Sequence, residues 1–232
     1  KIVALDHGDA YPRSIVLLKY KTSVSSGKFV PSYSKPCIAV DMLQISGTLG
    51  DNSTGCSAGG FEISSTGYLA CFNSIRQGSA SSIRDIYISY VSHSGTSAEI
   101  KRLTSYNSAG ASTPHLVKIN DSRFMMLWSH NGKVNYCTVD GEGNLTSDIM
   151  SFEASLSDCQ PIVSGDSVVW YVWNNEIVTF YTVGISDISR RYKETFTSGH
   201  SYTVTGVNAS QVELSCLRKG EKTTGNIPSH FQ

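Results

Sequence analysis

The chain lacks an excess of charge of either sign. Its 232 residues include 19 lysines and arginines and 19 aspartates and glutamates. Proteins that hold a phosphate backbone or an anionic bilayer surface do so with clustered positive charge. The balanced composition therefore predicts no nucleic-acid partner and no electrostatic attachment to a membrane surface.

Long apolar runs are also missing. The longest stretches, such as VVWYVW at residues 168–173, are far shorter than the roughly 20 residues that a membrane-spanning helix needs. We therefore predict no membrane insertion. The first residues, KIVALDHGD, lack the apolar length and the cleavage site of a signal peptide, so we expect any such peptide to have been removed.

The six cysteines lack the spacing of a zinc site, since no C-x-x-C pair occurs among them. Cys71 and Cys137 lie inside apolar runs, where a free thiol behaves as a small hydrophobic group. Disulfides are the alternative if the compartment is oxidising. In that case we expect Cys56 and Cys71 to pair, because Cys56 lies just before a predicted first strand and Cys71 lies at the end of the adjacent second strand.

What the sequence does contain is a repeated unit of three short strands separated by polar turns. Runs of β-branched and aromatic residues between turn signals predict strands, and short turns between consecutive strands predict antiparallel meanders. The expected strands are 61–63, 68–72 and 86–91 in one copy, 116–119, 124–128 and 134–139 in the next, and 162–163, 168–173 and 177–183 in the last.

A single meander cannot bury both of its faces, whereas copies packed around an axis can. The first sixty residues fit a further copy without its opening strand, and two alternating runs near the end, SYTVTGV and QVELSCL, predict a hairpin. We therefore predict an all-β fold, a propeller-like array of about four antiparallel β-meander repeats plus a C-terminal β-hairpin. The predicted repeats are 1–55, 56–110, 111–156 and 157–184, followed by 185–232.

Two segments resemble repeats of known secreted proteins. The pattern YTVTG…VEL…L-x-x-G-x-K…IPS resembles the start of small β repeats in large cell-surface proteins of Gram-positive anaerobes. The units typified by PHLVKINDSRFMMLW…VDGEGN resemble propeller-type repeats of similar secreted proteins. The resemblance implies an extracellular or cell-surface location and a place within a larger surface protein.

The candidate binding residues lie in the loops after the second strands, which converge on one face if the units are equivalent. Amides and hydroxyls beside an aromatic ring suit neutral polyols, so we expect non-enzymatic binding of a glycan or a protein. A hydrolase that uses Asp6, His7 and Asp9 is one alternative, and a purely structural spacer is another. The expected ligand-binding residues are His7, Asp9, Asn73, Arg76, His130, Trp173 and Asn174.

One turn has oxygen donors at alternate positions. Asp140, Glu142 and Asn144 resemble the front of a calcium loop, but position twelve counted from Asp140 is Ser151 rather than a bidentate glutamate. The same residues are typical of an ordinary tight turn between strands. We predict no cofactor and keep calcium at this turn as the alternative.

Overall fold

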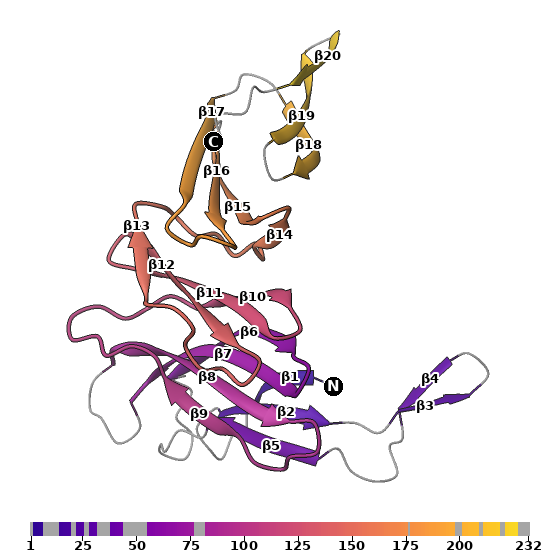
Figure 1. Ribbon diagram of the computed structural model, residues 1–232, viewed down its shortest axis with the longest axis vertical. Coiled ribbons are helices and arrows are strands. Elements are labelled where there is room, and N and C mark those ends of the chain that lie inside the picture. The colour runs from indigo at the N-terminus through magenta and orange to yellow at the C-terminus, as the bar shows by residue number, and fades with distance from the viewer. Residues whose placement is uncertain are drawn as a thin grey trace. The chain divides into compact units, whose positions relative to one another are not determined.

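The computed structural model of the chain consists of β-strands and the turns between them (Figure 1). The part of the chain that it describes includes no helix, and so no helix that could span a membrane. Two compact units make up the chain, Lys1–Ser151 and Phe152–Gln232. The described residues are 2–6, 14–19, 22–25, 28–31, 38–43, 55–76, 82–175, 177–197, 201–208, 211–218 and 221–226.

The first unit contains two four-stranded antiparallel sheets that match the predicted meanders. In each, the strands are hydrogen-bonded in the order in which they occur along the chain. The nine strands expected in the three repeats are all present, each one to five residues longer than predicted, and a fourth strand completes each meander. The second sheet is β6 Cys56–Ile63, β7 Gly67–Ile75, β8 Arg84–Ser92 and β9 Glu99–Arg102, and the third sheet is β10 His115–Asn120, β11 Arg123–His130, β12 Lys133–Asp140 and β13 Met150–Phe152.

The N-terminal residues form a three-stranded first sheet, in the order β1-β2-β5. This agrees with the expectation of a repeat without its opening strand. A separate two-stranded ribbon, β3 with β4, interrupts the sheet and was not predicted. The strands are β1 Ile2–Asp6, β2 Ser14–Lys19, β3 Thr22–Ser25, β4 Lys28–Pro31 and β5 Ile38–Leu43.

The second sheet is buried on both faces, because β7 alternates between two hydrophobic clusters. Tyr68 and Phe72 pack in a cluster with Ile15 of the first sheet. Leu69 lies in the other cluster with Phe124 of the third sheet. Antiparallel sheets commonly leave one face to water, so two buried faces indicate face-to-face stacking of sheets. Each large apolar side chain buried in this way stabilises the fold by roughly 1.5–3 kcal/mol.

Two adjacent glycines allow β6 and β10 to approach closely. A Cβ atom on Gly59 would lie 2.3 Å from the carbonyl oxygen of Pro114, and one on Gly60 would lie 2.5 Å from Cβ of Leu116. The pairing of β6 with β7 is irregular between Ala58 and Phe61, at the same place. The absence of side chains at Gly59 and Gly60 therefore allows the second and third sheets to pack closely.

The second unit contains a fourth sheet and a C-terminal sheet. In the fourth sheet, β17 adds a strand beyond residue 184, the expected end of the last repeat. The predicted C-terminal hairpin is present as β18 paired with β19, and β20 extends it to a three-stranded sheet. The strands are β14 Ile162–Ser164, β15 Ser167–Asn174, β16 Ile177–Gly184, β17 Arg191–Thr197, β18 Ser201–Asn208, β19 Gln211–Arg218 and β20 Glu221–Asn226.

Candidate functional site

Two of the predicted binding residues, Arg76 and His130, lie where the second strands of neighbouring sheets end. Arg76 follows β7 directly. His130 is the last residue of β11, which a two-residue turn joins to β12. Both turn residues, Asn131 and Gly132, have positive φ angles, 49° and 73°, as the tight hairpin turns preferred between twisted strands require. The turn therefore fixes the position of His130.

The segment after β9 connects these two strand ends, and Arg76 holds it in place. The Nε atom of Arg76 donates to Oδ2 of Asp85 over 2.8 Å. Its terminal nitrogen donates to the hydroxyl of Ser105 over 2.9 Å and to the carbonyl oxygen of Tyr106 over 3.1 Å. The Arg76 side chain is still 34% exposed. One guanidinium thus joins β7, β8 and the following segment.

Asp85 is the buried centre of this assembly, with a side chain that is 0% exposed. Its Oδ1 atom accepts a hydrogen bond from the Tyr106 amide over 2.7 Å and one from the Thr104 hydroxyl over 3.2 Å. Burial of an ionised carboxylate is costly unless it is paired and hydrogen-bonded. Asp85 meets both conditions, because Arg76 pairs with it and Tyr106 and Thr104 donate hydrogen bonds to it.

Tyr106 brings the two strand ends together. Its ring stacks on the imidazole of His130, with centroids 3.6 Å apart and planes inclined by 17°. The indole nitrogen of Trp128 donates to its hydroxyl over 2.8 Å. Burial, with a contribution from the charge of Asp85, raises the pKa of Tyr106 above its usual value, so the phenol is neutral at pH 7. His130 is further held because its Nε2 donates to the carbonyl oxygen of Ala109 over 3.1 Å.

Asn73 lies near this assembly but is part of its support. The side chain is in β7 and only 2% exposed. Its Nδ2 atom donates to the carbonyl oxygen of Ala111 over 3.0 Å, and its Oδ1 atom accepts from Arg84 at 3.5 Å. The amide therefore anchors the chain entering β10 and has almost no surface for a ligand.

Of the other predicted binding residues, two lie in the second unit and two lie outside the described residues. Trp173 and Asn174 end β15, and both are exposed, Trp173 by 71%. The indole nitrogen of Trp173 donates to the carbonyl oxygen of Asn175. His7 and Asp9 lie outside the described residues.

The Asp140 turn is closed by its own hydrogen bonds. Oδ1 of Asp140 accepts from the amides of Glu142 and Asn144, each over 2.9 Å, and Oδ2 accepts from Nδ2 of Asn144 over 2.8 Å. The ammonium of Lys101 donates to the Glu142 carbonyl oxygen and to Oδ1 of Asn144. Lys101 therefore supplies a positive charge at these oxygens. Within the described ranges, no group of three or more His, Cys, Asp or Glu could hold a metal ion.

The expected Cys56–Cys71 disulfide is wrong. Cys56 pairs in register with Ser74 and packs in the cluster facing the first sheet, whereas Cys71 packs in the cluster facing the third. Of the cysteines whose side chains the structure describes, Cys56, Cys71, Cys137 and Cys159, none forms a disulfide. Burial raises the pKa of Cys71 and of Cys137 to about 12, so both are inert at neutral pH.

Sequence reasoning missed Asp85 and Tyr106, the two residues that organise the site. The only signal for Asp85 is a carboxylate at the start of an otherwise apolar strand, in RDIYISYV. Tyr106 is the one aromatic residue in the polar stretch TSYNSAG. Neither pattern indicates a partner, because the partners come from other strands.

Comparisons with known proteins identify no family for this chain. No protein-family model matches it, and neither does any curated protein. A solved structure described as "NanB plus Optactamide" aligns with 12% identity and a TM-score of 0.39, over 90% of this chain and 40% of that one. The chain thus spans less than half the length of that structure, and this likeness supports no functional conclusion.

Proposed function

We propose that the chain is a non-enzymatic recognition or scaffold domain that binds a glycan or a protein through its strand-end loops. We further propose that its stacked sheets form a propeller-like array, and that it works outside the cell as part of a larger surface protein. The repeated meanders and the two buried faces of the second sheet support the array.

The Arg76–Asp85–Tyr106–His130 assembly is the observation that carries the binding proposal. It fixes a connecting segment against two strand ends while Arg76 and His130 remain partly exposed. Pre-ordered polar groups lose less conformational entropy when a ligand binds. Asp85 accepts three hydrogen bonds and Nε2 of His130 bonds to a carbonyl oxygen, so the assembly is suited to recognition rather than to proton transfer.

The test compares two histidines at opposite ends of the stacked sheets. His130→Phe keeps a ring that can stack on Tyr106 but removes the bond to Ala109. His93 follows β8, which runs antiparallel to β7, and it contacts Tyr68 edge to face with centroids 4.9 Å apart. His93→Phe is therefore the matched control at the far end of the second sheet.

The measurement is binding to a glycan array and pull-down of surface proteins. We expect His130→Phe to weaken ligand binding about tenfold, or about 1.4 kcal/mol, because the bond from the imidazole to Ala109 no longer fixes the connecting segment before the ligand binds. His93→Phe should bind like the wild type. Equal binding by both variants would place the site elsewhere. A wild-type chain that retains neither glycan nor protein would reject the proposal.

A further inference from the structure

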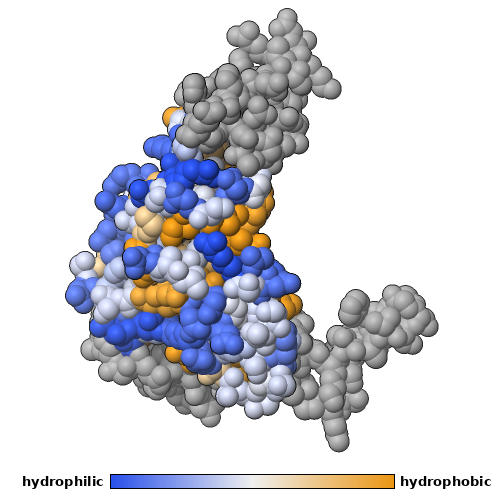
Figure 2. All heavy atoms as spheres, in the orientation of Figure 1, coloured by the Kyte–Doolittle hydropathy of each residue, from blue (hydrophilic) through white to orange (hydrophobic). Residues whose placement is uncertain are grey.

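Strand β15 of the fourth sheet carries two exposed aromatic rings near its C-terminal end. Tyr171 is 42% exposed and Trp173 is 71% exposed. They alternate along β15, so both lie on the same face of the fourth sheet, about 6.6–6.8 Å apart along the strand. We call Tyr171 and Trp173 the aromatic platform. Figure 2 colours the described part of the chain by hydropathy, with hydrophobic residues in orange among hydrophilic ones in blue.

The third sheet has no such pair of exposed rings at the equivalent positions. The first residues of β11 and β15 pair with the last residues of β12 and β16, so the two strands align position by position. Tyr171 then corresponds to Leu127, which is 0% exposed, and Trp173 corresponds to Ser129, a small polar residue. The fourth sheet thus carries large aromatic rings where the third has a buried aliphatic residue and a serine.

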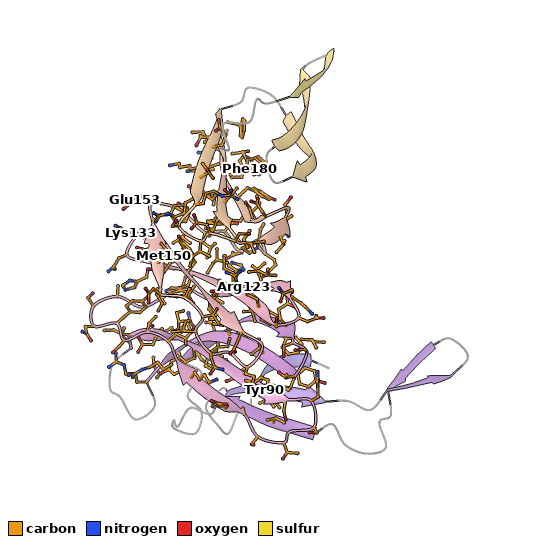
Figure 3. The ribbon with its side chains drawn as sticks, viewed as in Figure 1. Tyr90, Arg123, Lys133, Met150, Glu153 and Phe180 are labelled. Carbon is orange, nitrogen blue, oxygen red and sulfur yellow. The ribbon has the colours of Figure 1, made fainter. Side chains whose placement is uncertain are left out.

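Both rings are held in place before any ligand arrives. The only donor of the Trp173 indole is used, because it bonds to the carbonyl oxygen of Asn175. Tyr171 packs on Phe180, labelled in Figure 3, with centroids 5.9 Å apart. Phe180 in turn contacts Phe196 edge to face at 5.8 Å. The indole therefore presents a flat apolar ring face rather than a hydrogen-bond donor.

The charges of the fourth sheet argue against an anionic ligand. Lys193 pairs in register with Tyr181, and it lies over that ring, 5.9 Å from the centroid. Glu194 pairs with Phe180, a residue that contacts Tyr171. Because neighbouring residues on a strand face opposite ways, the acid shares the platform's face and Lys193 does not.

We propose that the aromatic platform is a stacking site for a neutral saccharide. The C–H-rich faces of sugar rings pack on flat aromatic rings, which bury apolar area while leaving the sugar hydroxyls free. This inference rests on the proposed recognition function and names its ligand class.

The experiment uses the fact that Trp173 is the one exposed tryptophan of three, since Trp128 and Trp170 are 0% and 3% exposed. Fluorescence quenching by acrylamide in the 232-residue chain therefore reports mainly on Trp173. The probes are neutral hexasaccharides of glucose, xylose and mannose, with polygalacturonate and a proline-rich peptide as alternatives. We expect at least one neutral hexasaccharide to protect Trp173 from the quencher and polygalacturonate not to do so.

Variants then test the platform itself by calorimetric titration with the protecting hexasaccharide. Trp173→Ala and Tyr171→Ala should each weaken binding about tenfold, and Trp173→Phe should weaken it less. Ile162→Ala is the matched control, because Ile162 is 55% exposed and pairs with Val169 on the same face but is aliphatic.

Each result separates the platform from the broader function. Saccharide binding that Trp173→Ala leaves intact but His130→Phe abolishes would overturn the platform and retain the proposed function. Protection by the proline-rich peptide alone would replace the saccharide with a protein ligand and so overturn the inference. No protection by any neutral hexasaccharide would also overturn it.

Discussion

At the scale of single residues, the ion pair between Arg76 and Asp85 dominates the site. Arg76→Met would leave the Asp85 carboxylate buried without its cation. We expect a loss of about 2–4 kcal/mol of unfolding free energy, somewhat below the cost for a fully buried pair because Arg76 is partly exposed. Urea denaturation of the purified variants measures this.

The double variant Arg76→Met with Asp85→Asn gives the control for the pair. The asparagine removes the unpaired charge but keeps a side-chain oxygen that can accept a hydrogen bond from the Tyr106 amide. We therefore expect the double variant to be more stable than Arg76→Met alone. A double variant no more stable than the single one would show that charge burial is not the cause.

The Asp140 turn makes a second residue-scale prediction, on pH. Partial burial acts to raise the pKa of Asp140, but hydrogen bonds from Asn144 and Glu142 and the charge of Lys101 outweigh it and hold the pKa below its usual value. A lowered folded-state pKa stabilises the protein above the unfolded value of about 3.9, and this contribution is lost as the pH falls through the folded value.

Asp140→Asn should therefore cost about 1 kcal/mol at pH 7 and less at about pH 2. Asp148→Asn, at an exposed aspartate in the connection that follows, is the control. Urea unfolding at the two pH values compares the variants. A loss that is the same at both values would contradict the assigned cause.

At this scale, only part of the site could be predicted from the sequence. Arg76 and His130 were found because each lies in the loop after a predicted second strand, a position that local patterns show. Asp85 and Tyr106 were missed because their role depends on contacts between segments far apart in the chain, such as that from Arg76 to Tyr106, 30 residues away. No local pattern encodes such contacts.

At the scale of elements, the glycine pair of β6 makes a packing prediction. Gly60→Ala would place a methyl group 2.5 Å from both the backbone nitrogen and Cβ of Leu116. The strands must then move apart, and overpacking of this kind costs about 1–3 kcal/mol. Gly110→Ala is the control, because its nearest neighbour, the Arg84 nitrogen, is 3.1 Å away. Thermal denaturation that ranks Gly110→Ala as the more harmful change would contradict this.

The strands themselves were largely predictable, because their alternation and the turn residues between them are local signals. The Cys56–Cys71 pairing failed because β6 begins at Cys56, before the expected start of the strand at residue 61. Cys56 is therefore held in register opposite Ser74 rather than lying in a loop that could reach Cys71. The short β13 Met150–Phe152 was missed because three residues carry no detectable period.

At the scale of the whole molecule, the alternation of SYTVTGV and QVELSCL predicts that one of them pairs with the open edge of the first sheet or caps the last repeat. The first of these two arrangements is not found in the part of the chain that the structure describes. Among the described strands, β18, β19 and β20 pair only with one another, and β1 pairs only with β2. Edge pairing between distant parts of a chain depends on tertiary arrangement, which a strand's own alternation does not determine.

Two truncations test where the repeat array ends. A chain that stops after Thr197 loses β18, β19 and β20 but keeps β17, so we expect its melting temperature to match that of the 232-residue chain. A chain that stops after Gly184 also loses β17, which leaves β16 as an exposed edge and removes the contact of Phe196 with Phe180. Unpaired apolar edges promote aggregation.

The shorter chain should therefore melt at a lower temperature and elute partly as aggregates in size-exclusion chromatography. Phe196→Ala in the 232-residue chain separates the two causes, because it removes the ring contact and retains the paired edge. We expect this variant to be destabilised by roughly 1–3 kcal/mol, less than a fully buried phenylalanine because Phe196 is only half-buried, and to remain monomeric. If both truncated chains melt alike, β17 is not an integral strand of the fourth sheet, and the array ends at residue 184.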